Sequence, residues 1–497
     1  MRLYMVRRTR SFIQENYAET DLGTGRTYLT FADGSRSYFP TRQPRTVTFG
    51  MADHDPHDQY ALLYSAPVVD AINKLTLPRY GLGNYLQEKP HDPPGAAEAR
   101  IMANLSRAGK RLMGFCRTNL FKRLESSGQA FLQSLERHVL RNFVYLHAIE
   151  SDQPLPIGTQ DANLLDVRFN ESDRELFGPE DDEANGDQLP ELGNLRTETD
   201  FRRHAAHIYA TYAGPLKRRF RWLRADRFLP QLAQDLRADL DALLNILETC
   251  GTWSPERDAK LGQLIQLITR THRGEKLLIF SQFADTVNYL VAQLQACGLG
   301  QVAAVTGDSE NPTQLAWRFS PVSNNRRAQV SPEQELEVLI ATDILSEGQN
   351  LQDAAIVVNY DLPWAIIRLI QRAGRVDRIG QHSQTLLCYS FLPADGVERS
   401  LRLRARVRQR LRENAEVVGT DEAFFDDDQN DQAVRDLFTA KAGILDGDDE
   451  AEVDLSSYAL QIWKNAIDRD PSLQKTITAL PNVLSSTKPP PCPAREP

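Results

Sequence analysis

The sequence predicts an α/β protein with a parallel β-sheet wrapped by helices, preceded by a mostly α-helical region and followed by an acidic tail. Beyond Asp258, short apolar runs bounded by turn residues alternate with amphipathic stretches, which is typical of β–α–β units. Before that point, apolar residues recur at helical spacing. Acidic runs such as Asp426-Asp427-Asp428 mark the C-terminal part. These three observations define the predicted fold class.

Composition excludes several classes of protein. The 497 residues are 41% hydrophobic, which is enough for roughly three domains with buried cores. No apolar run approaches the roughly 20 residues that cross a bilayer, and the N-terminus lacks the apolar core of a signal peptide. We therefore expect a cytoplasmic protein without membrane contact. The five cysteines form no C-x-x-C pair, so neither a zinc cluster nor a disulfide framework is predicted.

Charge is unevenly distributed along the chain. The net charge of −9 argues against a simple nucleic-acid coat protein. Basic stretches nevertheless occur at Lys217-Arg218-Arg219 and between Arg399 and Arg412. Each could meet phosphates or form a solvated helix face, and the sequence does not decide between these interpretations.

Four segments are predicted before the sheet. Residues 1–50 begin with the basic run Val6-Arg7-Arg8-Thr9-Arg10 and contain two alternating runs around Asp33-Gly34, which indicate a β-hairpin. Residues 51–150 have helical periodicity. Residues 151–200 are rich in polar and turn-forming residues and are predicted to be an acidic linker or surface insertion. In residues 201–257, a stripe of leucines from Leu229 to Leu247 predicts a long helix.

The predicted sheet occupies residues 258–400, and residues 401–497 are predicted to be C-terminal helices and an acidic tail. Ligands of parallel α/β sheets bind beyond the carboxyl ends of the strands, so the residues after each strand are the candidate site. The predicted strands are 277–280, 302–305, 338–341, 355–358 and 386–391. The candidate residues after the first three strands are Ser281, Gln282, Thr306, Gly307, Thr342, Gly348 and Asn350.

These polar residues suit contact with phosphates. Thr342 places a hydroxyl just past a buried strand, and Gly348 lacks a side chain that would block close backbone approach. Such a turn can donate hydroxyl and backbone N–H groups to the phosphates of a nucleic-acid strand. For any single residue, ordinary turn chemistry at a strand end is the alternative.

A second pattern concentrates arginine after the fourth strand. Gln371, Arg375 and Arg378 are spaced i, i+4 and i+7, which predicts one face of a helix on which all three converge on an anion. Two guanidiniums match a polyphosphate, and an arginine placed against a transferring phosphoryl group can contribute about 10³–10⁵ in rate. The alternative is a surface helix with salt bridges to Asp377 or a neighbour.

Taken in order, these segments resemble motifs IV, V and VI of superfamily-two helicases, which lie on the second RecA-like lobe of those motors. The end Arg378-Ile-Gly-Gln381 resembles the Swi/Snf-related branch and its bacterial HepA/RapA-like members. Glu347-Gly348-Gln349-Asn350 also fits that branch and argues against strand separation. Two segments outside the predicted sheet extend the resemblance. Arg7-Arg8-Thr9 is similar to the basic segment after the first lobe, and Lys122 to Ser127 is similar to the interlobe helical segment.

The resemblance implies specific roles for the candidate residues. Arg375 and Arg378 would be arginine fingers, with Gln371 and Gly348 also in the ATP site. Thr342, Gly348 and Asn350 would couple the nucleotide state to the grip on the strand. The residues implied to contact nucleic acid are Ser281, Gln282, Thr306, Gly307, Thr342 and Asn350.

This sequence contains neither the phosphate cradle nor the acidic box of a first lobe. The nearest candidate cradle, Gly23-Thr-Gly25-Arg26-Thr27, has arginine in place of lysine and leads into a hairpin. Asp182-Glu183 and Asp421-Glu422 have neither the strand nor the order that the box requires. We therefore predict no metal site in this chain and expect a first RecA-like lobe, in cis or in trans, to hold ATP and its Mg²⁺. Truncation at the basic segment is a hypothesis that upstream coding DNA would test.

Three functions are compatible with the sequence. The leading hypothesis is the second motor lobe of an ATP-dependent, DNA-stimulated translocase that is inactive without a first lobe and acts on nucleic acid, with double-stranded DNA as the expected form. An autonomous ATPase would need a cradle that the sequence lacks. The third is a non-catalytic nucleic-acid-binding or scaffold remnant of such a motor.

Overall fold

The computed structural model describes residues 17–391 except 24, 32–33, 35, 52–54, 56, 89–91, 106–109, 159–194, 196, 308, 347–348, 364–366 and 379. The predictions for the basic run at 6–10, for most of the acidic linker and for the C-terminal tail lie outside these residues. The chain divides into two compact units at residue 36. In the first, β1 (Glu19–Thr20) pairs antiparallel with β2 (Thr27–Thr30). β3 (Arg36–Tyr38) follows β2 in the chain, so each of the two alternating runs of the predicted hairpin contains a strand.

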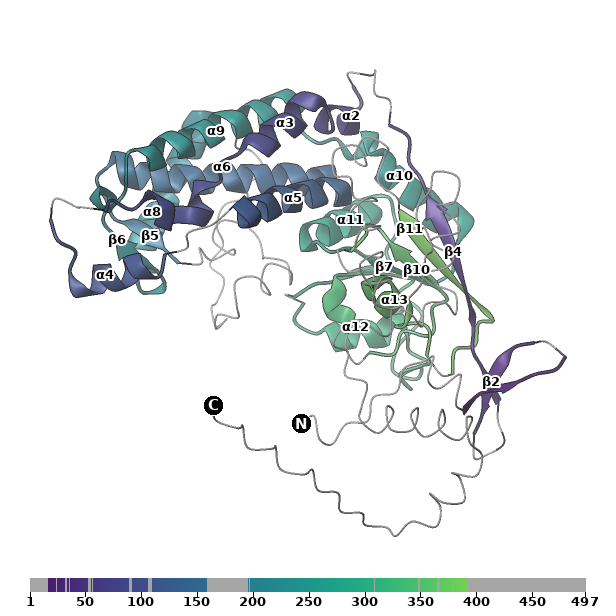
Figure 1. Ribbon diagram of the computed structural model, residues 1–497. Helices are drawn as coiled ribbons and strands as arrows, with labels where there is room; N and C mark the ends of the chain where they lie inside the picture. The colour runs from purple at the N-terminus through teal and green to yellow at the C-terminus, as the bar shows by residue number, and fades with distance from the viewer. Residues whose placement is uncertain are drawn as a thin grey trace, which may run out of the picture. The chain divides into compact units, whose positions relative to one another are not determined.

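The second unit contains a six-stranded sheet in which every neighbouring pair is parallel, in the order β4-β11-β10-β7-β9-β8. This confirms the predicted fold class. The strands are β4 (Thr41–Val47), β7 (Leu277–Phe280), β8 (Val302–Val305), β9 (Val338–Ala341), β10 (Ile356–Asn359) and β11 (Thr385–Phe391). Figure 1 shows β4, from the N-terminal part of the chain, beside β11.

The β4 strand is the member of the sheet that the sequence did not predict. It comes from residues assigned to the N-terminal segment and pairs with β11 from Thr41↔Thr385 to Val47↔Phe391. It lies at the edge of the sheet, which explains how it accommodates Pro44, a residue that cannot donate a backbone hydrogen bond.

The connections define where the sheet is open to a ligand. β7 and β10 are neighbours, paired from Leu277↔Ile356 to Phe280↔Asn359. From β7 the chain continues to β8 on one side of the sheet, whereas from β10 it continues to β11 on the other. The carboxyl ends of β7 and β10 therefore flank a topological switch point, the usual ligand position in open parallel sheets.

Helices cover both faces of this sheet. Alternate residues of β7 point to opposite faces. Leu277 and Ile279 belong to one core cluster and Leu278 and Phe280 to a second. The first cluster is continuous with the helical region, and the second includes Phe319 of α12. The helices of this part are α10 (Ala259–Gln266), the π-helical η6 (Leu267–Thr271), α11 (Ala284–Ala296), α12 (Pro312–Phe319), the 3₁₀ turn η7 (Asp343–Ser346) and α13 (Ile367–Ala373).

The region before the sheet is mostly helical, as predicted. Its central helix α6 packs against α8 and α9 (Figure 1). The helices are α2 (Gln59–Leu63), α3 (Ala66–Lys74), α4 (Ala96–Ala103), α5 (Lys110–Ser126), α6 (Gly128–Glu150), α8 (Glu198–Ala213) and α9 (Gln231–Cys250). The 3₁₀ segments are η2 (Pro78–Tyr85), η3 (Lys217–Arg219), η4 (Ala225–Arg227) and η5 (Pro255–Arg257). Strands β5 (Leu155–Ile157) and β6 (Arg221–Leu223) pair antiparallel.

The leucine stripe predicted from Leu229 to Leu247 corresponds to α9. Leu232, Leu236, Leu240 and Leu243 are buried, whereas Leu229 precedes the helix and is 40% exposed. None of the helices that the structure describes is both long enough and apolar enough to span a bilayer.

The break between α5 and α6 determines where the end of α5 lies. Ser127 is the N-cap of α6, and its hydroxyl accepts a hydrogen bond from Ala130 N. Gly128 follows directly beneath the ring of Trp253, where an added Cβ would lie 2.2 Å from a ring atom. Only glycine lets the backbone at residue 128 lie this close to the Trp253 ring. This close packing holds the last residues of α5 against the domain that contains the six-stranded sheet.

Candidate functional site

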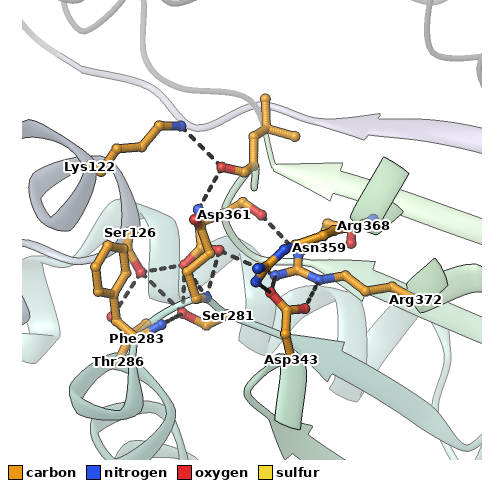
Figure 2. Close-up of polar contacts among 12 residues, drawn as sticks. Lys122, Ser126, Ser281, Phe283, Thr286, Asp343, Asn359, Asp361, Arg368 and Arg372 are labelled. Atoms are coloured by element: carbon orange, nitrogen blue, oxygen red, sulfur yellow. Dashed lines mark hydrogen bonds and ion pairs between the residues drawn. The ribbon is translucent and has the colours of Figure 1, made fainter. Parts of the chain in front are cut away.

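The candidate site lies at the carboxyl ends of β7, β9 and β10, where buried charged and hydroxyl groups gather. Asp361, two residues past β10, is 1% exposed. Its Oδ2 accepts hydrogen bonds from Ser281 Oγ at 2.5 Å and from Ser126 Oγ at 2.6 Å, and its Oδ1 accepts one from the backbone N–H of Gln282 at 2.9 Å. Figure 2 shows Asp361 between Ser126 of α5 and Ser281. One carboxylate thus joins β7, β10 and the helical region.

This geometry changes the interpretation of Ser281. Its side chain is completely buried and its hydroxyl donates to Asp361. The hydroxyl therefore organises the loop after β7 and is not presented at the surface, where a nucleic-acid strand would lie. The neighbouring Gln282 is partly buried, and its Nε2 donates to the carbonyl oxygen of Leu362 at 2.6 Å.

A second buried cluster lies after β9. Arg372 of α13 is 1% exposed and holds Asp343 in a two-pronged ion pair, with Nε–Oδ1 at 2.6 Å and Nη2–Oδ2 at 3.1 Å. Arg368 adds a third bond at 3.2 Å (Figure 2). Burial by itself would raise the pKa of Asp343, but the two guanidiniums outweigh burial and keep the pKa below its ordinary value. The charge of Arg372 is therefore neutralised within the protein.

Arg372 also joins this cluster to the first one. Its Nη1 donates to Asn359 Oδ1 and to the carbonyl oxygen of Asp361, both at 3.2 Å. The sequence analysis missed Arg372 and Asp343. The available signals were an aspartate two residues past a buried strand and a further arginine in residues 368–380, the arginine-rich segment. Spacing alone favoured Arg375 and Arg378.

The helix predicted to carry Gln371, Arg375 and Arg378 is shorter than expected, and this part of the prediction is wrong. α13 ends at Ala373, before Gly374, a residue with low helix propensity. Gln371 is exposed on α13, whereas Arg375 and Arg378 are partly buried in the turns that follow. The three residues therefore do not share a helix face.

Arg378 contacts Asn350, a residue that is predicted from the sequence to bind a nucleic-acid strand. Its Nη1 donates to Asn350 Oδ1 at 2.5 Å, and burial lowers the pKa of Arg378. The carbonyl oxygen of Asn350 in turn accepts a bond from Asn324 Nδ2 at 2.8 Å. A neutral amide oxygen leaves the charge of the guanidinium uncompensated, in contrast to the carboxylate at Arg372.

The remaining candidates differ in accessibility. Thr306 is 5% exposed, with its backbone N–H bonded to Ser309 Oγ at 2.9 Å, whereas Gly307 beside it is exposed. Thr342 is partly buried, and its backbone N–H donates to the carbonyl oxygen of Val305. Gly348 lies outside the described residues, and the structure says nothing of its predicted role.

The N-terminal strand braces the arginine-rich segment. Arg42 of β4 pairs with the buried Asp377 at 2.5 Å between Nε and Oδ2. The backbone N–H of Gly380 donates to Ser37 Oγ at 3.1 Å. Asp377 therefore pairs with a strand that is distant in sequence.

The helical region is also anchored to the site, through the end of α5. Lys122 Nζ donates to the carbonyl oxygen of Leu362 at 3.0 Å (Figure 2). Arg123 and Arg137 both pair with Asp285 of α11, at 2.9 and 2.8 Å. The contacts of Lys122 and Arg123 fall in the Lys122–Ser127 segment, which resembles an interlobe helical segment in sequence, whereas Arg137 lies on α6.

Lys260 completes this anchor. It is 2% exposed, and its Nζ donates to the carbonyl oxygens of Glu125 at 2.7 Å and Ser126 at 2.9 Å, the last two residues of α5. Its ammonium lies 4.1 Å from the centre of the Tyr360 ring. Burial lowers its pKa from 10.5 to about 8. A cation at the C-terminal end of a helix is favourable for the helix dipole.

Comparison with known proteins identifies the class of this site. Residues 259–380 match the family model of the helicase conserved C-terminal domain. The match includes the carboxyl ends of β7, β9 and β10 and the arginine-rich segment up to Gly380. This part of the chain is therefore a helicase C-terminal domain, a RecA-like α/β lobe with its parallel sheet.

The similarity to individual proteins is confined to part of the chain. It is 34% identical over 125 residues to YqhH, an uncharacterized ATP-dependent helicase of Bacillus subtilis (strain 168), covering 25% of this chain and 20% of that protein. It is 26% identical over 179 residues to the DEAD-box ATP-dependent RNA helicase 35B of Oryza sativa subsp. japonica, covering 36% and 26%. The matched stretch thus spans about a quarter or less of each relative.

Two solved structures also show similarity to this chain. The C-terminal part of the Fun30 ATPase domain is 12% identical, with a TM-score of 0.34, over 73% of this chain and 90% of that chain. The E. coli DEAD-box protein SrmB, crystallised with the regulator of ribonuclease activity A, is 20% identical, with a TM-score of 0.24, over 30% and 78%.

Proposed function

We propose that this chain supplies the second motor lobe of an ATP-dependent, nucleic-acid-stimulated translocase of the Swi/Snf-related branch, with double-stranded DNA as its track. The observation that carries the proposal is the hydrogen bond between Arg378 and Asn350 within the helicase C-terminal domain. This bond joins Arg378, which is proposed to contact ATP, directly to Asn350, which is proposed to contact the nucleic-acid strand. The end Arg378-Ile-Gly-Gln381 favours the bacterial HepA/RapA-like members of that branch.

The arginine-rich segment fits a polyphosphate. Arg378 bonds to a neutral amide, so its charge is available to an anion, whereas Arg372 is committed to Asp343. Arg375 is also partly buried, and both arginines follow the end of α13. In the proposed mechanism Arg375 and Arg378 stabilise the charge that develops on the transferred phosphoryl group. Gln371, which is exposed on α13, is a further proposed contact of ATP. The first lobe holds ATP and its Mg²⁺, which neutralises phosphate charge.

The same segment provides a route from nucleotide to strand. When Arg378 turns toward a phosphate, it breaks its bond to Asn350 and frees that side chain. Asn350 is held through its backbone by Asn324, so the change is local to its side chain. The proposed strand contacts are Gln282, Gly307, Thr342 and Asn350. The buried Ser281 and Thr306 position these loops from beneath.

The proposal requires a first lobe from elsewhere, either in another part of a longer polypeptide or on a second chain. Within this sequence no G-x-x-x-x-G-K-[ST] cradle is present. The same observation supports the second candidate, a scaffold module that binds nucleic acid without hydrolysing ATP. The third, an autonomous ATPase, would have to hold ATP without a cradle.

The test is ATP hydrolysis stimulated by a DNA duplex, measured for the chain alone and together with a matching first lobe that contains the cradle. We expect no hydrolysis by the chain alone and hydrolysis by the pair. Arg375→Ala and Arg378→Ala should each lower kcat by about 10³-fold. Arg270→Ala is the matched control, because Arg270 is exposed on η6 of the same domain, and it should change kcat less than about 2-fold.

Hydrolysis by the chain alone would contradict the proposal and favour the autonomous ATPase. Association of the two lobes without hydrolysis would favour the scaffold. Repeating the assay with an RNA duplex distinguishes the track, since the proposal expects stronger stimulation by DNA.

A further inference from the structure

A second basic surface lies in the helical region, outside the helicase C-terminal domain. Lys217, Arg218 and Arg219 form η3, and Arg221 begins β6. All four are exposed. We call these four residues the basic turn. These four positive charges lie within five residues of a chain whose net charge is −9.

The cations of the basic turn differ from other arginines of the same region. Arg202 pairs with Glu150 and Glu198 at 2.8 and 2.9 Å, and Arg203 pairs with Asp200 at 3.1 Å. Arg237 pairs with Glu198 at 2.6 Å and with Asp241 at 3.2 Å.

Three of the four cations of the basic turn, Lys217, Arg218 and Arg221, differ from these paired arginines. Of the residues that the structure describes, no carboxylate lies within 4.0 Å of the side-chain nitrogens of Lys217, Arg218 or Arg221. Like charges held this close repel one another, and a polyanion would relieve that repulsion.

The backbone of the basic turn is fixed. Trp222 Nε1 donates to the carbonyl oxygen of Lys217 at 2.9 Å, and Arg219 N donates to that of Leu216 at 2.9 Å. Arg221 pairs with Ile157 of β5. Figure 1 shows β6 beside β5 at the end of α8. The cations are therefore carried by an ordered element, which reduces the entropy lost when they bind a ligand.

Aromatic packing supports the same element from within. Phe220 is 6% exposed, and its ring centre lies 4.4 Å from that of the fully buried Tyr212. The Trp222 ring meets the ring of Tyr209 edge-on at 5.9 Å. The hydrophobic side chains thus face the helical region while the basic side chains face solvent.

We propose that the basic turn binds the phosphate backbone of duplex nucleic acid at a site separate from the motor lobe. Several fixed cations suit a polymer that presents phosphates in succession, and guanidinium groups match phosphate oxygens in geometry. The contact is electrostatic and independent of sequence. The choice of nucleic acid over an acidic protein rests on the proposed function, because the motor lobe and the basic turn would then hold one polymer.

The test measures how salt weakens binding of the full chain to a fluorescein-labelled DNA duplex, without nucleotide or first lobe. The variant combines Lys217→Ala, Arg218→Ala and Arg221→Ala. The matched control combines Arg202→Ala, Arg203→Ala and Arg237→Ala, which removes the same three charges from residues that already have carboxylate partners. Thermal unfolding of both variants verifies folding.

Loss of three phosphate contacts should reduce the slope of log K against log salt by about 2.7. Between 50 and 200 mM salt, wild-type affinity should then fall about 40-fold more than that of the basic-turn variant. The control variant should keep a slope within about one unit of the wild type. Equal losses in both variants, or no binding by the wild type, would overturn the proposal.

Two further outcomes separate this proposal from its alternatives. If polyglutamate binding depends on the basic turn and duplex binding does not, the partner is an acidic protein and the proposal is wrong. Because the assay contains neither ATP nor a first lobe, its result does not depend on hydrolysis. A failure of the motor proposal would appear in the ATPase assay while leaving the salt slope unchanged.

Discussion

Arg372 and Arg378 belong to one arginine-rich segment and have opposite surroundings. Arg372 is 1% exposed and bound on two sides of its guanidinium by Asp343. Arg378 is partly buried and bound by the amide of Asn350. The first arginine stabilises the junction of β9, β10 and α13, while the second keeps its charge available for a ligand. Residue type alone does not separate structural from functional arginines, whereas the partner of each guanidinium does.

Removal of Arg372 should have the largest effect on stability. Arg372→Ala leaves Asp343 buried without its main cation, so the free energy of unfolding should fall by about 3–5 kcal/mol. Urea unfolding followed by circular dichroism measures this difference. The double variant Arg372→Met, Asp343→Leu removes both members of this buried ion pair, and most of the lost stability should return.

A large effect of Arg372→Ala on hydrolysis, without an effect on stability, would contradict the distinction between Arg372 and Arg378. If Arg372→Ala lowered hydrolysis by the two-lobe complex as strongly as Arg378→Ala, while the free energy of unfolding changed by less than about 1 kcal/mol, Arg372 would also be a ligand contact.

Lys260 gives a prediction about pH. Its pKa is lowered to about 8 by burial, so between pH 8 and 10.5 the unfolded chain binds more protons than the folded chain. The free energy of unfolding should therefore rise with pH across this window, by up to about 3 kcal/mol from this group. The measurement is the difference between the wild type and Lys260→Met, which cancels other titrating groups. A difference independent of pH would show that Lys260 is not desolvated at the end of α5.

The smallest expected effect concerns the bond between α5 and the sheet part. Ser126→Ala removes one of the donors to Asp361 and should lower the free energy of unfolding by about 1–2 kcal/mol. Ser134→Ala is the control, because that buried hydroxyl donates to a carbonyl oxygen of its own helix, that of Ala130, at 2.7 Å. It should cost less than about 0.5 kcal/mol. Equal effects would show that the hydroxyl of Ser126 does not strengthen the junction.

Five strands of the sheet and the residues at their carboxyl ends could be predicted from the sequence, because both depend on local patterns. Buried strands read as apolar runs, and the polar residues after them mark the carboxyl edge. β4 was missed because an edge strand with Pro44 and alternating exposed residues has no apolar run. The end of α13 was missed because the spacing of Gln371, Arg375 and Arg378 fits a helix, while Gly374 between them ends it.

The partners of the buried charges could not be predicted from the sequence. Asp361 binds Ser126, and Asp377 binds Arg42, across separations that no local pattern encodes. Such pairs form only when the tertiary structure brings distant segments together. The charge of the basic turn was visible in the sequence, whereas the sequence did not show that Lys217, Arg218 and Arg221 have no carboxylate partner among the described residues.

The central claim is that Arg378 acts on ATP held by a first lobe, and single-turnover hydrolysis in the two-lobe complex tests it most directly. With saturating DNA duplex, Arg378→Ala should slow the chemical step by about 10³-fold while the free energy of unfolding changes by less than about 1 kcal/mol. A chemical step of unchanged rate in a folded Arg378→Ala complex would contradict the account.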